Sequence, residues 1–272
     1  MAFNIYVLSP TQAQIWFAGQ PTGTGMLKTV KQWGIDNGAD LCFNLAEFNA
    51  STNKLSCCEV VAQGRRISWG YADRSDMLYI DDKNYCRGYS NGIKDGIVKL
   101  NKAKGGKRTR NGIGITDKGY RIIAQSSHKC TEKDFCDAVN ANVKNKGQKV
   151  KLFILEDGGG STTSYSSRSK LIFNPEPDNP KKPEVQRPVA TVVCVRFTNI
   201  PIMTRPIAKD CNGNDVMMLQ MILGGIEVDG NAGTGTKSRI IAAQTALGMA
   251  PNLRLGAASA LTYKRLGLVY SI

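Results

Sequence analysis

The sequence has few of the features that mark membrane, disulfide-rich or zinc proteins. Among its 272 residues no apolar run approaches the roughly 18 residues that cross a bilayer. The eight cysteines form no regular framework, and Cys57 and Cys58 are adjacent. The one histidine, His128, stands near Cys130 and Cys136 without the paired spacing of a zinc site. We therefore expect no membrane partner, no zinc site of this type, and free, mostly buried thiols.

The N-terminus also lacks a secretion signal. The opening residues, MAFNIYVLSPTQAQIWF, have neither the basic start nor the small-residue cleavage site of a signal peptide. Their alternating apolar residues predict a first β-strand instead. We expect the protein to be made in the cytoplasm, so that any action outside it would need another route of export.

Acidic residues are too few to balance the basic ones. Lys and Arg number 36 against 22 Asp and Glu, which gives a formal net charge of +14. Such an excess favours anionic partners: nucleic acid, acidic lipid or phosphate-bearing wall polymers. The densest basic run, KLNKAKGGKRTR at 99–110, contains no aromatic residue, whereas single-strand binders usually add stacking rings. Nucleic acid is therefore disfavoured, and the run is either a solvated loop or a phosphate-facing loop.

The patterns along the chain predict an α+β fold with two domains. GIGITDKGYRIIAQ at 112–125 is typical of a β-hairpin. A capping box of Thr131 and Asp134 opens a predicted helix over 131–145, and the apolar run VKLFIL at 150–155 follows as a buried strand. For residues 1–198 we predict a mixed, largely antiparallel β-sheet domain with flanking helices.

The C-terminal part is predicted to be a small helical domain. Residues 199–209 change in composition and include two prolines, so we interpret them as a linker. Beyond it, apolar residues at helical spacing predict three short helices near 215–223, 238–248 and 257–267, joined by glycine turns. These helices form a predicted three-helix domain over residues 210–272.

The stretch FILEDGGGSTTSY at 153–165 is the most unusual segment of the first domain. An apolar strand ends abruptly in two acids, three glycines and several hydroxyls. Such a segment could be a flexible linker, a phosphate cradle or the floor of an active site. A buried strand leads into it and another predicted strand, VATVVCVRF at 189–197, follows, so the linker interpretation is the weakest of the three.

Motifs around this stretch occur in a specific order. In chain order, the first motif is FNLAEFN, and the second is GKRTRNGIGITDKGYRIIAQ. A predicted helix and a predicted strand follow, and the strand leads into EDGGGST. The last motif is EVQRPVATVVCV. This order resembles the phosphodiester glycosidase family, which includes the enzyme that uncovers mannose 6-phosphate by removing N-acetylglucosamine. The matching positions are Asn44, Phe48, Arg110, Ile113, Gly114, Asp157 to Thr162, Arg187, Pro188 and Val189.

The chemistry of sugar phosphodiesters agrees with this resemblance. Glycosidic cleavage commonly needs carboxylates, one to stabilise or attack the cationic sugar carbon and one to manage the proton. Asp157, Glu47 and Glu156 are the candidates, and the resemblance adds Asn44 to the catalytic set. The phosphate monoester is a good leaving group, so cationic help at the phosphate matters more than a strong general acid.

Other residues are predicted to bind the substrate. A guanidinium grips two phosphate oxygens at once, and glycine N–H groups approach an anion closely because no Cβ intervenes. Serine and threonine hydroxyls can orient sugar or phosphate oxygens. The predicted substrate-binding set is Arg110, Gly158, Gly159, Gly160, Ser161, Thr162 and Arg187.

Several of these assignments have a structural alternative. Glu156 stands where the family has leucine, and Glu47 where it has an aromatic or small residue, so each is an accessory acid, a metal ligand or a tolerated change. Asp157 could only form a turn, and Asn44 could be a core amide. Arg187 could form an ion pair that holds the two β-layers together. We expect no cofactor, leave a divalent metal open, and expect His128 in an exposed loop.

The C-terminal sequence NGNDVMMLQMILGGIEVDGNAGTGTKSRIIAAQTALG resembles the peptidoglycan-binding domain family. The alternative is that these helices serve only to pack against the first domain. GNAGTGTK is not a phosphate-binding P-loop, because Lys237 comes one residue too late. The residues that match the family pattern are Gly213, Asp215, Val216, Leu219, Gln220, Leu223, Asp229, Gly230, Gly233, Thr236 and Gln244.

Together the two resemblances imply a cell-wall-directed hydrolase. It would cut an N-acetylglucosamine-like sugar from a sugar-1-phosphodiester while its C-terminal module holds an anionic wall glycopolymer or peptidoglycan. The combination resembles a bacteriophage lysin, virion-associated or released at lysis, that acts at the bacterial cell wall. The alternative is a non-catalytic protein that binds a phosphosugar or wall polymer.

Overall fold

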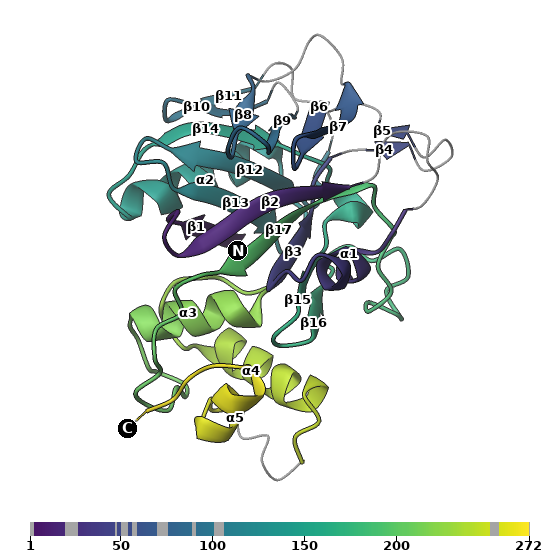
Figure 1. Ribbon diagram of the computed structural model, residues 1–272. Helices are drawn as coiled ribbons and strands as arrows, with labels where there is room; N and C mark the ends of the chain where they lie inside the picture. Colours follow the sequence, from purple (N-terminus) through teal and green to yellow (C-terminus); the bar gives the residue numbers. More distant parts are fainter. Residues whose placement is uncertain are drawn as a thin grey trace.

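Two facing β-sheets form the N-terminal part of the protein, and a group of three helices lies against one end of them (Figure 1). The computed structural model describes residues 3–19, 27–46, 48–49, 54–55, 59–69, 76–88, 91–100, 106–250 and 256–271. The predicted α+β class is confirmed. No helix in these ranges is both long enough and apolar enough to span a bilayer.

Sheet A has the strand order β1-β13-β12-β14-β10-β11, and every neighbouring pair is antiparallel. The predicted hairpin over 112–125 is confirmed as β12–β13, and the helix α2 (Glu132–Asn145) begins at the predicted capping box. Helix α2 covers the outer face of the sheet through Phe135, Val139 and Val143. The strands are β1 (Phe3–Leu8), β10 (Gly92–Lys94), β11 (Ile97–Lys99), β12 (Asn111–Thr116), β13 (Arg121–Ser126) and β14 (Val150–Leu155).

Sheet B has the order β16-β15-β3-β17-β2, again antiparallel throughout. Helix α1 (Val30–Asp36) covers its outer face with Val30 and Trp33, and Gly38 follows the helix with a φ of +60°. The strands are β2 (Ala13–Gly19), β3 (Leu41–Asn44), β15 (Ser164–Ser166), β16 (Leu171–Phe173) and β17 (Thr191–Phe197).

Two smaller sheets lie at the end of the sandwich away from the C-terminal helices (Figure 1). One is the pair β4 (Phe48–Asn49) and β5 (Lys54–Leu55). The other has the order β7-β6-β9-β8, with β6 (Glu59–Ala62), β7 (Arg65–Trp69), β8 (Leu78–Tyr79) and β9 (Tyr85–Arg87).

Alternate side chains of the two large sheets fill the core between them. Because successive strand residues point to opposite faces, Tyr6 and Ile123 of sheet A face inward while their neighbours Ile5 and Ile122 pack beneath α2. The Tyr6 ring meets Phe43 of sheet B edge-on, with ring centroids 5.2 Å apart. This inward row therefore holds the two sheets together.

The three predicted C-terminal helices are present as α3 (Asn214–Leu223), α4 (Thr234–Ala246) and α5 (Ala260–Arg265). The segment predicted as a linker is firmly packed. Met203 and Ile207 are fully buried, and their N–H groups donate to the carbonyls of Val269 and Ala258. Both side chains belong to the same apolar cluster as Tyr6, so the helices and the sandwich share one core.

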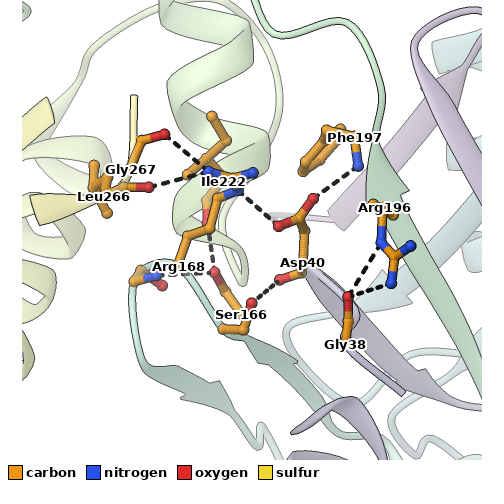
Figure 2. Close-up of polar contacts among 11 residues, drawn as sticks. Gly38, Asp40, Ser166, Arg168, Arg196, Phe197, Ile222, Leu266 and Gly267 are labelled. Atoms are coloured by element: carbon orange, nitrogen blue, oxygen red, sulfur yellow. Dashed lines mark hydrogen bonds and ion pairs between the residues drawn. The ribbon is translucent and has the colours of Figure 1, made fainter. Parts of the chain in front are cut away.

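A charged contact joins the helices to sheet B (Figure 2). Asp40, just before β3, accepts a hydrogen bond of 2.7 Å from Arg168 Nε, and its other oxygen accepts from Phe197 N at 2.8 Å. Arg168 Nη1 also donates to the carbonyls of Leu266 and Gly267, which follow α5. One guanidinium thus connects the β15–β16 turn, β3 and the end of the helical module.

The hairpin β15–β16 is held by further contacts from the helices. Ser166 Oγ donates to the carbonyl of Ile222 at 2.6 Å, and Ser169 Oγ donates to that of Leu223 at 2.9 Å. Arg239 on α4 lies against β16, and burial lowers its pKa to about 10. The helices therefore fix the hairpin that directly follows the glycine stretch.

Glutamines of the peptidoglycan-binding-like pattern stabilise turns. Gln220 Nε2 donates to Asp229 Oδ1 at 2.8 Å and to Thr236 Oγ1 at 3.1 Å, while its Oε1 accepts from Gly230 N. In the next helix Gln244 repeats this arrangement at the following turn. Both glutamines are buried, so these pattern residues shape the module and do not reach its surface.

Candidate active site

The glycine stretch crosses from one sheet to the other. Strand β14 ends at Leu155 in sheet A, and β15 begins at Ser164 in sheet B. Between them, Gly159–Ser161 form a single 3₁₀ turn. We call residues 156–163 the crossing loop. The flexible-linker interpretation is therefore wrong, because the loop joins two layers of one core.

A row of buried polar side chains lies beneath the crossing loop. The register places Gln125 opposite both Asn4 and Asn111, and Glu156 N donates to the Asn111 carbonyl at 2.9 Å. These four residues are between 0% and 4% exposed. They replace the apolar inward row at this end of sheet A, so the core ends in a polar layer under the loop.

Asn44 ties the loop to this layer. Its Oδ1 accepts from Thr163 N at 3.2 Å and Gln125 Nε2 at 3.4 Å, and its Nδ2 donates to the Asp157 carbonyl at 3.0 Å. Its own carbonyl accepts from Asn111 Nδ2. These contacts correspond to the core-amide alternative, in which Asn44 positions the loop. A catalytic contact for Asn44 stays a prediction.

Thr109 and Glu176 hold the glycine turn. Gly159 N donates to the Thr109 carbonyl at 2.9 Å, and Thr109 Oγ1 lies 2.8 Å from the Gly159 carbonyl. Glu176 Oε2 accepts from Thr109 N at 3.1 Å, and its other oxygen pairs with Lys129 Nζ at 2.9 Å. The N–H groups of Asp157, Gly159 and Thr162 are thus all bonded within the protein, and an anion contact from the glycine N–H groups stays a prediction.

Glu176 is a residue that sequence reasoning missed. Burial acts to raise its pKa, but hydrogen bonds from Lys129 and Thr109 outweigh that effect and hold the pKa below its ordinary value. Glu176 is therefore kept as a carboxylate. It lies in the proline-rich segment after β16, and no spacing in the sequence links it to the glycines.

Arg187 lies over the turn and is paired with Asp178. Its Nε lies 3.2 Å from Asp178 Oδ2, and its Nη2 pairs with Asp178 Oδ1. The same Nη2 lies 2.7 Å from where a Cβ on Gly160 would stand, so the guanidinium rests against that glycine. The hydrogen bond to Asp178 raises the pKa of Arg187, and the charges of Asp157 and Glu176 add to this. The half-buried Asp157 is therefore within electrostatic reach of Arg187.

Arg110 points away from this group. Its guanidinium is buried, with Nη1 3.0 Å from Glu132 Oε1 and Nη2 3.1 Å from the Gly106 carbonyl. Asn111 faces the space between the sheets, so its neighbour Arg110 faces the other side, toward the start of α2. The structure therefore does not bring the two predicted phosphate-binding arginines together.

The two adjacent acids lie in different surroundings. Glu156 is buried, with Cys86 Sγ 3.8 Å from its Oε1. Burial, and then the charge and hydrogen bonding of Glu156, place the pKa of Cys86 well above its ordinary value. Asp157 is only half-buried, which fits the expectation that the two do not share one pocket. Glu47 lies outside the described residues.

The predicted hydroxyl groups lie inside the protein. Ser161 and Thr162 are both buried, and within the described residues Thr162 Oγ1 has no hydrogen-bond partner. A substrate contact from either hydroxyl stays a prediction. Their placement follows from the crossing, which carries the chain back into sheet B.

Other titratable groups complete the description. In the described part of the chain, no three His, Cys, Asp or Glu side chains are grouped as metal ligands. His128 lies in a loop, as expected, but it is half-buried against Phe3, at 5.0 Å between ring centroids, and not fully exposed. The six described cysteines are free and five of them are buried, as predicted.

Comparison with known proteins supports the fold. No protein-family model matches the sequence, and no curated protein does. The catalytic domain of zebrafish N-acetylglucosamine-1-phosphodiester alpha-N-acetylglucosaminidase, auto-inhibited by its pro-peptide, is similar with a TM-score of 0.51 and 14% identity, over 72% of this chain and 88% of that one. A hypothetical protein from Synechocystis gives a TM-score of 0.52 and 11% identity, over 72% of this chain and 59% of its own. At these identities the likeness shows a distant phosphodiester-glycosidase-like fold.

Proposed function

We propose that the protein is a glycosidase that cleaves an N-acetylglucosamine-like sugar from a sugar-1-phosphodiester. The observation that carries this proposal is the meeting of Asp157, Arg187 and the glycine turn at the crossing loop. A carboxylate, a guanidinium and close-approach backbone are what the two ends of a sugar–phosphate bond require. The fold likeness to an enzyme that carries this activity in its name supports the same class.

In this mechanism each group has one task. Asp157 stabilises or attacks the sugar carbon as its bond to the phosphate oxygen breaks, and water then supplies the hydroxyl group of the released sugar. Arg187 binds two oxygens of the departing phosphate, which leaves as a monoester and needs little protonation. Asn44 and Glu176 act as positioning residues, because the first holds the Asp157 carbonyl and the second holds Thr109 under the turn.

The test is a hydrolysis assay on an N-acetylglucosamine-1-phosphodiester. We expect Asp157→Asn to reduce kcat strongly, because it removes the charge without changing the shape. Arg187→Lys should lower kcat/KM, since a lysine cannot grip two oxygens together. Lys151→Gln, at an exposed position on β14, is the matched control. Full activity in Asp157→Asn would exclude the proposed role of Asp157.

We further propose that the substrate or tether is an anionic cell-wall glycopolymer or peptidoglycan. The support is the net charge of +14 and the pattern of the C-terminal helices. Because the pattern glutamines are buried, any wall contact must use the outer surface of the module. A pull-down with purified Gram-positive walls at about 0.05 and 0.5 M salt tests this, since exposed charge attraction is screened. Absence of binding at low salt would contradict it.

A non-catalytic phosphosugar- or polymer-binding function is the second candidate. The observation that favours it is that Asn44 and Glu156, two of the predicted catalytic residues, are buried in the polar layer. Of the candidate acids in the crossing loop, Glu156 is buried in that layer and Asp157 is half-buried. Binding of the phosphodiester with no release of sugar would select this candidate over the hydrolase.

A further inference from the structure

A recess lies at the other end of sheet B from the crossing loop. It has a volume of about 540 Å³ and opens on the outer side of the edge strand β2. Thr191, whose carbonyl binds Leu45 N beside the loop, and Arg196, which lines the recess, are five residues apart on β17. At about 3.3 Å per strand residue the separation is roughly 17 Å. The recess is therefore a distinct place on the molecule.

The buried side-chain amide of Asn84 holds one side of the recess in place. Asn84 Oδ1 accepts hydrogen bonds from Phe17 N on β2 at 2.9 Å and from Gln63 N at 3.1 Å. The side-chain Nδ2 of Asn84 donates to Asp81 Oδ1 at 3.0 Å. These bonds dock the turns β6–β7 and β8–β9 onto the edge of sheet B. The recess is thus a fixed feature of the fold.

The acids of the recess are already occupied. Asp36 accepts from Lys28 Nζ and Gln32 Nε2, both at 2.6 Å. Asp81 accepts from the main-chain N of Lys83 at 2.8 Å, and from Asn84. The charge of Asp36 is thus balanced by Lys28, whereas Asp81 accepts only from neutral N–H groups and forms no ion pair within the described residues.

The cationic and amide side chains of the recess, in contrast, have hydrogen-bond donors without a partner among the described residues. Arg196 uses Nε and Nη2 on the Gly38 carbonyl, which leaves Nη1 without a partner among the residues that the structure describes. In the same described ranges, the ammonium of Lys83 and the side-chain amides of Gln14 and Gln63 also make no hydrogen bond. All three of these side chains are exposed. The two amides offer both donors and acceptors, and two of the unused donors, those of Arg196 and Lys83, carry positive charge.

An aromatic ring completes the lining. Trp16 is half-buried: it packs against the apolar cluster on the outer face of sheet B, and the Arg196 guanidinium lies over its ring, 5.4 Å from the centroid, so that only the remaining part of the indole lines the recess. A tryptophan ring offers a large apolar surface at low entropic cost, while amides such as Gln14 donate and accept together. Sugar rings present apolar C–H groups beside hydroxyls that also donate and accept. The two cations add a place for one negatively charged substituent.

We propose that this recess binds a phosphate-bearing sugar, with the accessible part of Trp16 beside the sugar and Arg196 and Lys83 at the phosphate. The inference does not depend on the proposed hydrolase activity. A second sugar-phosphate site would let the protein hold a polymer of such units at two places, which strengthens attachment without new catalytic contacts.

The test is a titration of the full chain with N-acetylglucosamine 6-phosphate, followed by ¹H–¹⁵N NMR. This probe is not a 1-phosphodiester, so it is no substrate of the proposed reaction. We expect saturable shifts of the Trp16 indole and of the Gln14 and Gln63 side-chain amides, at roughly millimolar concentration. Trp16→Phe assigns the indole signal among the three tryptophans.

Variants test whether Lys83 and Arg196 are responsible for the binding. The double variant Lys83→Gln and Arg196→Gln should weaken binding by about tenfold, because charge-assisted bonds are lost. Lys151→Gln, on β14 of the other sheet, should leave it unchanged. Unfolding in urea checks that the double variant stays folded, and Lys83→Gln alone should give a smaller loss if it does not.

Three outcomes would overturn the proposal. One is that shifts occur only at residues 157–162 and Arg187, which would locate the phosphosugar at the crossing loop alone. Another is that unphosphorylated N-acetylglucosamine binds as tightly, which would remove the role of the cations. The third is that adenosine monophosphate binds more tightly than the sugar phosphate, which would make the recess a nucleotide site.

Discussion

At the scale of single residues, ion pairs determine which charges remain available to a substrate. Arg187 is held by Asp178 through both Nε and Nη2, the two-point geometry that arginine also uses for phosphate. Asp178 therefore occupies the position in which a substrate phosphate would bind. By contrast, Arg110 is buried and is held by Glu132 at the start of α2 and by the Gly106 carbonyl.

Asp178→Asn is expected to strengthen the binding of phosphate. The change keeps the size of the side chain and removes the competing charge, so the Kd for inorganic phosphate should fall about two- to fivefold, the range of a partly exposed ion pair. Isothermal titration calorimetry measures this. Asp137→Asn, in the exposed pair with Lys133, is the control. A weaker affinity in Asp178→Asn would show that Asp178 orients Arg187 for binding.

Glu176 should make the stability of the protein depend on pH. Its pKa is lowered in the folded protein, so its contribution is present above the ordinary glutamate pKa of about 4.3 and is lost as pH falls through the folded value. Because the side chain is partly exposed, we expect Glu176→Gln to cost about 1 kcal/mol at pH 7. Urea unfolding should show this difference shrinking as the pH falls below the ordinary glutamate pKa, and disappearing below the lowered folded value. A difference that persists there would assign the effect to packing.

At the scale of elements, the crossing loop depends on close approach between main chains. A Cβ on Gly158 would lie 2.5 Å from the Thr109 carbonyl oxygen, so the loop cannot keep its path with a larger residue. Thr109 in turn holds Gly159 through its own carbonyl and hydroxyl. The glycines are therefore needed for the path of the loop, whatever they bind.

Gly158→Ala should destabilise the protein by about 1–3 kcal/mol, the usual cost of forcing extra atoms into a packed site. Gly235→Ala is the matched control, because nothing lies within 4 Å of its Cβ position in the first turn of α4. There we expect a change of at most about 1 kcal/mol, in the stabilising direction. Equal effects of both variants in urea unfolding would contradict the prediction that a Cβ at Gly158 collides with the Thr109 carbonyl.

Local patterns in the sequence predicted the elements better than the site. The capping box at Thr131 and the hairpin over 112–125 depend on neighbouring residues, and both are confirmed. The polar row from Asn4 to Glu156 depends on the register of four strands, which no local pattern specifies. Glu176 reaches Thr109 across 67 residues for the same reason. The glycine stretch was recognisable, but its partners were not.

At the scale of the whole molecule, the helical module is docked and not loosely tethered. Arg168 reaches the carbonyls of Leu266 and Gly267 while it pairs with Asp40 (Figure 2). Tyr6 Oη, on the inner face of sheet A, accepts a hydrogen bond from Gly225 N at 3.3 Å. Burial raises the pKa of this tyrosine to about 12. The junction is thus both apolar and hydrogen-bonded.

Arg168→Met should cost about 2–3 kcal/mol, because it leaves the partly buried Asp40 carboxylate without its cation. Arg265→Met, at an exposed position at the end of α5, is the control and should be close to neutral. The double variant with Asp40→Asn should lose less than the sum of the single losses, since the two residues form one contact. Additive losses in urea unfolding would show that the pair is not coupled.

Removal of the helices should abolish cooperative folding of the sandwich. Tyr6, Leu41 and Phe43 share one apolar cluster with Met203 and the α3 side chains, so a chain that ends at residue 198 would expose that surface. We expect this fragment to bind a hydrophobic dye and to lack a sharp urea transition. We also expect the full chain to unfold in one step, with tryptophan fluorescence and far-ultraviolet circular dichroism giving coincident curves. Two separated transitions, or a stable 1–198 fragment, would instead make the helices an independent module, as a flexible wall tether would require.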